Sequence, residues 1–316
     1  MTNTEIKSKK KLNLKTLLPI IVIGIVLLVY AVSIFVPLVW GLVTSFKSHR
    51  DFATWNNVLG FPNPKYSAAE MKFSNYKFVL ENFVVSNRVA YYFGNKQIVN
   101  RCNDGILNLF INTLLYAGVG CVLQGFVPAI VGYMCAKYPC KFSSIVYYVT
   151  LFSMAIPVVG NYPATINVLR SLHLYDEFYG NFVQQFNFSG MYFFVFYAYF
   201  KGMPNAYMEA AEIDGASQFY TLTRIVLPLA IKMIGSVMLI KFVALWNDYQ
   251  TPLLYLPTHP TLAYGVYNIS TRTDGDFTRI PVKIAAFMIL AIPILVVYSV
   301  LKNKIVGNMS MGGIKE

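Results

Sequence analysis

The sequence predicts an all-α membrane protein with six transmembrane helices. Hydrophobic residues make up 56% of the 316 residues and charged residues only 13%, which leaves too few polar groups to cover a soluble protein of this size. Long stretches without charge support the same class, because a helix needs about 20 mostly apolar residues to cross the hydrocarbon core of a bilayer.

Each expected transmembrane helix corresponds to one apolar stretch. Five stretches contain no charged residue: 16–46, 105–136, 142–169, 178–200 and 284–301. A further span, 229–256, is less apolar because Lys232, Lys241 and Asp248 interrupt it. We expect the first stretch to be a retained helix, because it is too long for a signal peptide and has no A-x-A-like cleavage site.

Basic residues predict the orientation in the membrane. A lysine-rich tail, 1–15, precedes the first helix, and Lys and Arg are enriched on the cytoplasmic side of membrane proteins. Six spans then return a second tail, 303–316, to the cytoplasm. We attribute the net charge of +12 to this topology and to anionic lipid headgroups, because there is no soluble basic domain to bind nucleic acid. The sequence thus predicts a multi-pass protein of the cytoplasmic membrane with both termini inside.

Between the first and second helices lies a long segment, 47–104, that is too polar to be a span. Its aromatic residues favour a small folded cap outside the membrane over a disordered linker. This cap would either contribute to a docking surface for another protein or pack only on the rest of the chain. The remaining residues, 105–302, form one core with five helices and a cytoplasmic loop at 201–228.

No enzyme motif is found in the sequence. It contains no GxxxxGK[ST] phosphate loop, no GxSxG and no HExxH. The three histidines are isolated and expected in solvated loops, and no CxxC pair suggests a metal site. We therefore expect no catalytic residue, no metal and no cofactor in this chain. Any ATP and Mg that act together with this chain would be bound by a partner subunit.

The cytoplasmic loop reads as a helix, a tight turn and a second helix. Pro204 suits the first turn of a helix, where its missing N–H has no intrahelical partner. Gly215 is expected in the left-handed conformation that ends a helix, and Ser217 can cap the next one. Glu209 and Glu212 are three residues apart, so they share one helix face.

The small residues Ala210 and Ala211 would let another surface approach this helix closely. Asp214 lies just before the turn, where its carboxylate could bind backbone amides of the second helix or a basic side chain of a partner. Two interpretations stay open at this point. The loop is either a docking element or an ordinary helical hairpin between membrane spans.

Polar residues in the less apolar span, 229–256, form a second candidate site. Asp248 follows Lys241 by seven residues, so a continuous helix would place both on one face. Asn247 and Gln250 lie nearby. Ionisable groups at this depth are costly and usually face a protein interior or an aqueous cavity. These four residues could line a route for a hydroxyl-rich solute, or they could form structural bonds to a partner helix.

Three sections of the chain resemble the maltose-type carbohydrate permeases of ABC importers. The most specific is similar to the family's coupling loop: Glu209-Ala210-Ala211, three residues, Gly215, nine residues, then Ile225-Val226-Leu227-Pro228. The others are Trp246-Asn247-Asp248 with Pro252-Leu253-Leu254, and Lys304-Ile305-Val306-Gly307 with Gly312-Gly313-Ile314-Lys315. The similarity covers roughly 105–316 and does not explain the longer loop before it.

The resemblance implies a type I ABC importer permease fold. It also implies a heterodimer with a second, related permease, two ABC ATPase subunits and an extracellular solute-binding protein that delivers a carbohydrate, expected to be an oligosaccharide. The residues that would couple to the ATPase are Glu209, Ala210, Ala211, Glu212, Asp214 and Gly215. The alternatives are an importer for a non-sugar solute such as a peptide, polyamine or phosphate, and a self-contained secondary transporter or channel. The lack of repeated halves and the scarcity of deep acidic residues disfavour the last.

Overall fold

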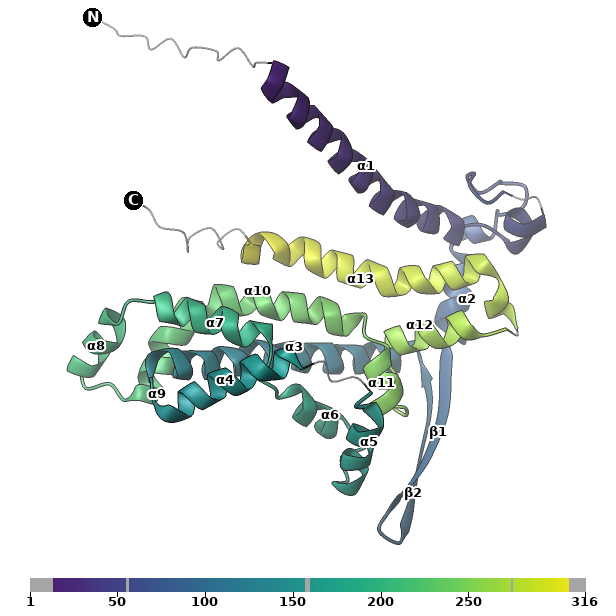
Figure 1. Cartoon of the computed structure of the whole chain (residues 1–316). Coiled ribbons are helices and arrows are strands. Elements are labelled where there is room, and N and C mark those ends of the chain that lie inside the picture. Colours follow the sequence, from purple (N-terminus) through teal and green to yellow (C-terminus); the bar gives the residue numbers. More distant parts are fainter. Residues whose placement is uncertain (1–13, 55–56, 157–159, 274, 307–316) are drawn as a thin grey trace, which may run out of the picture. The chain divides into compact units, whose positions relative to one another are not determined.

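The protein is mostly helical (Figure 1). The structure, a computed structural model, describes residues 14–54, 57–156, 160–273 and 275–306. The chain divides into two compact units, and each is described by itself: 1–76 with 279–288, and 77–278 with 289–316. Nearly all of the two expected tails, 1–15 and 303–316, lies outside the described residues.

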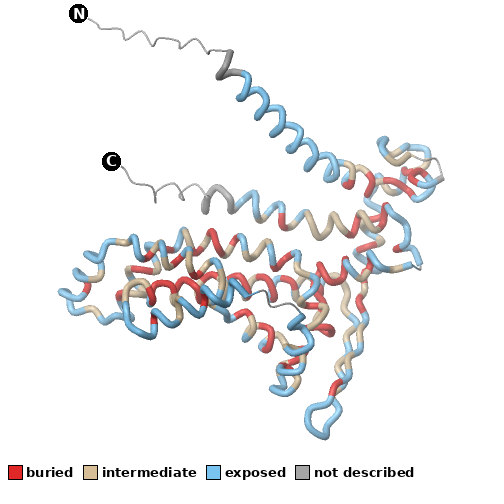
Figure 2. The backbone as a smooth tube through the Cα atoms, viewed as in Figure 1, coloured by how far each residue is buried: buried red, intermediate tan, exposed pale blue. Residues whose placement is uncertain are grey.

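A long apolar helix and a short polar segment dominate the first unit. Its elements are α1 (Leu14–Ser45), the π-helix η1 (Arg50–Thr54), the 3₁₀ helix η2 (Glu70–Lys72), the start of α2 (Ser74–Asn82) and the start of α13 (Ile280–Val306). Figure 2 shows α1 exposed along most of its length. An apolar helix with exposed side chains is expected in a bilayer, where lipid takes the place of water.

Buried polar contacts hold together the segment that follows α1. The carboxylate of Asp51 is 1% exposed and accepts hydrogen bonds from the Asn63 N–H at 2.8 Å and the Ser67 hydroxyl at 2.7 Å. Lys47 is fully buried, and its ammonium donates to the carbonyl of Asn57 at 2.7 Å. The segment is thus folded, as its composition predicts. Its place outside the membrane stays a prediction.

The second unit begins with the end of α2, and a β-hairpin that we did not predict follows it. The strands β1 (Val84–Phe93) and β2 (Lys96–Gly105) pair antiparallel. They are joined by the two-residue turn Gly94-Asn95, with φ +57° at Gly94. Glycine at the first central position suits a type II′ hairpin turn, and Gly-Asn after a run of β-branched and aromatic residues is a hairpin signal. The signal was therefore present in the sequence.

The rest of the second unit is helical. Its elements are α3 (Ile106–Lys137), α4 (Lys141–Ala155), α5 (Tyr162–Ser171), α6 (Phe178–Gln185), α7 (Met191–Gly202), α8 (Ala206–Ile213), α9 (Gln218–Thr221), the π-helix η3 (Leu222–Val226), α10 (Leu227–Trp246), α11 (Gln250–Tyr255), α12 (Leu262–Thr271), the 3₁₀ helix η4 (Asp276–Thr278) and the end of α13.

Four of the expected spans are confirmed as helices of sufficient length. Among the described residues, the helical stretches long and apolar enough to cross a membrane are Leu18–Ser45, Ile106–Lys137, Gln218–Trp246 and Ile280–Val300. The prediction of one continuous helix over 142–169 and another over 178–200 is wrong, because each is divided into two shorter helices. The count of six spans is therefore not confirmed.

Local backbone preferences explain the interruptions. Gly160 lies between α4 and α5 with φ +78°, and Gly190 lies between α6 and α7 with φ +141°. The side chain of Asn187 accepts a hydrogen bond from the Ser189 N–H at 2.8 Å, and such local turns compete with the helix. Pro157, which falls within the expected span 142–169, lies outside the described residues. Apolar composition alone does not ensure a continuous helix.

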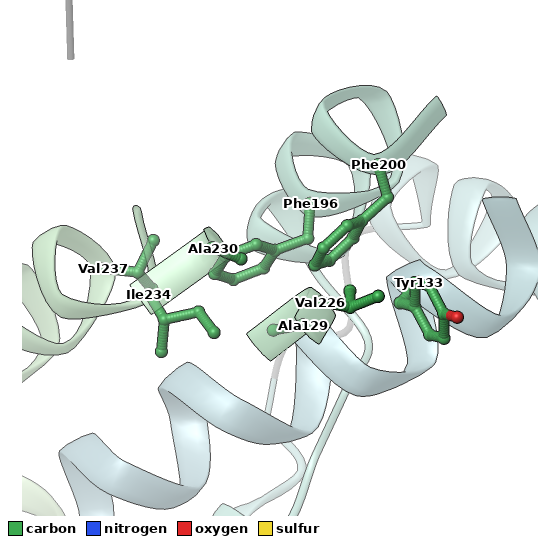
Figure 3. Close-up of a cluster of buried hydrophobic side chains, with 8 residues drawn as sticks. All are labelled: Ala129, Tyr133, Phe196, Phe200, Val226, Ala230, Ile234 and Val237. Atoms are coloured by element: carbon green, nitrogen blue, oxygen red, sulfur yellow. The ribbon is translucent and has the colours of Figure 1, made fainter. Parts of the chain in front are cut away.

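The core of the second unit lies where α3, α7 and α10 pack together. Figure 3 shows eight of its buried side chains: Ala129, Tyr133, Phe196, Phe200, Val226, Ala230, Ile234 and Val237. Small residues bring the helices close, as is usual between membrane helices. A Cβ added to Gly132 would lie 3.1 Å from the backbone nitrogen of Tyr197. This tight packing holds the helices that surround the candidate site.

A buried carboxylate anchors the hairpin to the helical part of this unit. Asp176 has no exposed surface and accepts hydrogen bonds from the Thr258 N–H at 2.9 Å, the Thr258 hydroxyl at 2.6 Å and the Asn100 amide at 2.8 Å. His259 Nδ1 lies 3.7 Å from the same carboxylate. The expectation that every histidine is isolated is therefore wrong for His259, because the fold brings Asp176 beside it.

This ion pair predicts how stability depends on pH. The carboxylate of Asp176 raises the pKa of His259 above its ordinary value, although burial opposes the shift. A raised folded-state pKa stabilises the protein fully below the unfolded value of about 6.5, and that contribution is lost as pH rises through the folded-state pKa. As pH rises, the wild type should lose about 0.5–1 kcal/mol of its free energy of unfolding, the size expected for a partly exposed pair. We expect His259→Gln to abolish this pH-dependent loss.

Thermal unfolding of the solubilised protein between about pH 5.5 and about pH 8.5 measures this effect. The matched control is His49→Gln, because His49 is exposed and should leave the wild-type pH dependence intact. An unchanged pH dependence in His259→Gln would contradict the prediction.

Candidate functional site

The expected helix–turn–helix is confirmed at α8 and α9. Gly215 has φ +75°, and its N–H bonds to the carbonyl of Glu212 while that of Ala216 bonds to Ala211. These two bonds form the Schellman motif that ends many helices. The hydroxyl of Ser217 caps α9 by accepting from the Tyr220 N–H at 3.2 Å. The expectation that Pro204 lies in the first turn of this helix is wrong.

The helix begins two residues later than expected. Asn205 is the N-cap of α8, so Pro204 precedes the cap and does not lie in the first turn. This proline therefore ends the connection from α7 and does not start the helix. The carbonyl of Met203 and the side chain of Asn205 both accept hydrogen bonds from the ammonium of Lys137, which lies in the last turn of α3. The start of α8 is thus bonded to the end of a core helix.

Most of the predicted coupling residues face away from the chain. Glu209, Ala210, Glu212, Asp214 and Gly215 are exposed, whereas the sixth, Ala211, is only 4% exposed and packs inward. The apolar side chain of Ile213 is 86% exposed beside them. The carboxylate of Asp214 makes no hydrogen bond to a described residue, so α9 does not use it. Acidic groups around an exposed apolar side chain form a surface suited to another protein.

A polar cavity of about 470 Å³ lies deeper in the same unit. Helices α3, α6, α7, α10 and α11 and the connections next to α7 and α11 line it. Amide side chains are prominent in the lining: Gln124, Asn181, Gln184, Gln185 and Asn187. A mixture of amide and aromatic groups in a concave site of this size is typical of small-molecule binding.

Two of the four predicted pathway residues line this cavity. Lys241 and Asp248 are both lining residues, whereas Asn247 and Gln250 are not. The reasoning from helix periodicity was wrong for Asp248, because α10 ends at Trp246. Tertiary packing, and not a shared helix face, brings Lys241 and Asp248 to one cavity. Asn247 instead donates its amide to a carbonyl within α10, at 2.8 Å.

Asp248 joins two helices at the cavity wall. One carboxylate oxygen accepts from the N–H groups of Gln250 at 3.0 Å and Thr251 at 3.1 Å, the first two residues of α11, whose N–H groups have no partner within the helix. The other oxygen accepts from the hydroxyl of Tyr116 in α3, at 2.7 Å. Its role in the described structure is therefore to position α11 against α3.

The amides of α6 were missed in the sequence. Asn181 is 1% exposed and Gln185 is 7% exposed, and neither side-chain amide bonds to a described residue. A Cβ on Gly120 of α3 would overlap the amide oxygen of Gln185, so this glycine makes room for the side chain. The amide-rich run Asn181–Asn187 inside an apolar stretch was the available signal.

The fold and this site define a class of protein. A polar cavity among apolar helices, several of them long enough to cross a membrane, is typical of a multi-pass membrane transport subunit. The family model described as "Binding-protein-dependent transport system inner membrane component" matches residues 128–306, more than half of the chain, and the chain belongs to this family. The expected family is thus confirmed, and its members are transport subunits of ABC transporters.

Curated relatives cover most of the chain at low identity. The diacetylchitobiose uptake system permease protein NgcG of Streptomyces coelicolor is 24% identical over 90% of this chain and 86% of its own length. The multiple sugar-binding transport system permease protein MsmG of Streptococcus mutans is 26% identical over 92% and 95%. The arabinooligosaccharides transport system permease protein AraQ of Bacillus subtilis is 24% identical over 65% and 73%.

A solved structure shares the fold. It is the crystal structure of a bacterial ABC transporter involved in the import of the acidic polysaccharide alginate. One of its chains matches with a TM-score of 0.72 and 20% identity, covering 93% of this chain and 99% of that one. At this identity the match establishes the fold alone, which agrees with the expected type I importer permease fold.

Proposed function

We propose that this chain is the permease subunit of an ATP-driven ABC importer for a carbohydrate, specifically an oligosaccharide. It forms half of the translocation pathway in the cytoplasmic membrane, with both termini in the cytoplasm. Its partners are a second, homologous permease, two ABC ATPases and an extracellular solute-binding protein. The family and the sugar-transport names of the relatives support this proposal. The chain itself holds no cofactor, and ATP and Mg belong to the ATPases.

The amide cavity is the observation that carries the carbohydrate assignment. Asn181 and Gln185 both line the cavity, and the donor and acceptor atoms of their side-chain amides are buried without a described partner. A buried polar atom without a partner costs about 1–3 kcal/mol, so a ligand that both donates and accepts relieves several such costs together. Sugar hydroxyl groups have this property. A peptide or a polyamine offers fewer groups that do both.

The bonded path from α8 to the cavity supports the coupling role. Glu209 and its neighbours present an exposed surface for an ATPase. A displacement of α8 is passed to α3 through Lys137, which bonds to Met203 and Asn205. Because α3 also supplies Tyr116 to the cavity wall, moving it changes the cavity. Close packing of α3, α7 and α10 transmits such shifts with little loss.

Reconstitution tests the proposed function. The chain is placed in proteoliposomes with the second permease and the ATPases, and ATP hydrolysis is measured with binding protein that carries a candidate solute. We expect stimulation and uptake with an oligosaccharide. Stimulation by a bound peptide or polyamine alone, or uptake by the single chain without ATP, would overturn the proposal.

Removing the cavity amides should slow transport. Asn181→Leu or Gln185→Leu keeps a similar volume but deletes both the donor and the acceptor. A lost hydrogen bond worth about 1.4 kcal/mol corresponds to about a tenfold change, so we expect about a tenfold lower uptake rate with saturating loaded binding protein. The control is Gln97→Leu, at an exposed position of β2. Wild-type uptake in both cavity variants would contradict the assignment.

A further inference from the structure

We propose that the saccharide is acidic and that the ammonium of Lys241 pairs with the carboxylate of a uronate unit in the cavity. The inference rests on the proposed function, because it names the kind of sugar that the same cavity takes. Four observations on the cavity lining carry it: the surroundings of Lys241, the bonds of Asp248, the neutral remainder of the lining and the nearby amide donors.

Lys241 is a cation without an anionic partner in the described structure. Its ammonium lies 4.9 Å from the centre of the Tyr192 ring. It makes no ion pair and no hydrogen bond to a described residue. The residue is half-buried on α10 and lines the cavity, whereas Lys232 of the same helix is exposed. A cation within a membrane-spanning helix usually has a partner or faces a site of function.

Asp248 is not the anionic partner of Lys241. It lies in the same cavity, yet its two oxygens already accept from Tyr116, Gln250 and Thr251. No ion pair joins it to Lys241 within the described residues. Its oxygens are thus bonded to three neutral donors and not to the ammonium of Lys241.

The remaining lining residues are uncharged, and several carry unused hydrogen-bond donors. The side-chain nitrogens of Asn181, Gln184 and Gln185 have no described acceptor. A carboxylate can accept about four hydrogen bonds, and bonds to an ionised acceptor are shorter and stronger than neutral ones. A uronate therefore uses the ammonium and the amide donors together. A neutral sugar uses the amides but leaves Lys241 unpaired.

A matched pair of substrates tests the inference. Uptake by the complete importer in proteoliposomes is measured with trigalacturonate and with the galactose trisaccharide of the same linkage, in which a neutral hydroxymethyl group replaces each carboxylate. We expect Lys241→Gln to reduce uptake of trigalacturonate at least about tenfold and uptake of the neutral trisaccharide less than about twofold. Lys241→Arg should retain most uptake of the acidic sugar. For each trisaccharide, the uptake rate of a variant is divided by that of the wild type with the same binding protein. Any preference of the binding protein for one trisaccharide therefore cancels.

The control on the same helix is Lys232→Gln, which should leave both rates unchanged. An equal loss for both trisaccharides in Lys241→Gln would overturn the inference. Failure of both Lys241→Gln and Lys241→Met to co-purify with the second permease would also overturn it, because Lys241 would then pair with a helix of that subunit. If the wild-type importer transports the neutral trisaccharide but not trigalacturonate, this inference is wrong and the proposed function is unaffected. Stimulation by a non-sugar solute alone defeats both.

Discussion

Replacing Glu209 with alanine is expected to uncouple ATP hydrolysis from uptake and to lower uptake at least about tenfold. A loss of this size is typical of an interface residue that contributes more than about 1.4 kcal/mol to binding. The Glu209 side chain is exposed and makes no bond to a described residue, so its removal leaves α8 folded. The loss would therefore arise where α8 docks on the ATPase. Uptake and stimulated ATP hydrolysis, measured with equal amounts of protein in the membrane, provide the readout.

Gly215 offers a second test of the same segment. Its φ of +75° is strained for any residue with a Cβ, while an added Cβ would meet no atom within 4 Å. Gly215→Ala therefore strains the turn by about 1–2 kcal/mol without a clash, and we expect a partial loss of coupling. The control is Glu81→Ala, at an exposed position of α2. Wild-type uptake and wild-type stimulated ATP hydrolysis in both Glu209→Ala and Gly215→Ala would rule out the coupling role.

Phe200→Ala should have the largest effect on stability. Phe200 has no exposed surface, and its ring lies 5.4 Å from that of Tyr133 in the core of α3, α7 and α10. Truncation leaves a cavity that the packed helices cannot close. Phe→Ala costs about 3–5 kcal/mol in soluble cores. We expect about 2–3 kcal/mol here, because lipid is as apolar as the core and only the packing contribution is lost.

Thermal unfolding in detergent or mild-denaturant titration measures this loss of stability. Phe142→Ala is the matched control, because the Phe142 side chain is 73% exposed and its truncation leaves no internal cavity. Equal stability of the two variants would show that the cluster in Figure 3 does not stabilise the fold.

The helix–turn–helix of α8 and α9 was predictable because its structure depends on local interactions. The turn at Gly215 needs only the residues of one helix end, and the cap at Ser217 needs only the next three residues. The hairpin turn at Gly94-Asn95 is equally local, and its signal was overlooked beside the membrane pattern. Whether an ATPase binds the exposed face of α8 remains a prediction for the coupling test.

The interrupted spans show the limit of apolar composition as a predictor. Hydropathy over 178–200 predicts burial in a membrane, but it does not predict that the helix ends at Gln185 and restarts at Met191. The side chain of Asn187 and the backbone of Gly190 end it locally. This break supplies part of the cavity lining, so the departure from a simple helix is what creates the candidate site.

The sequence by itself determined the class of protein, the family and the helix–turn–helix of α8 and α9, because composition and local motifs act within a few helical turns. Only the tertiary structure decided the cavity. Tyr116 and Asp248 bond across 132 positions of sequence, and Gln185 fits against Gly120 from another helix. No periodicity relates such residues, since packing and desolvation select which side chains meet once the helices are in place. The same packing separates Lys241, which lines the cavity, from Asn247, which does not.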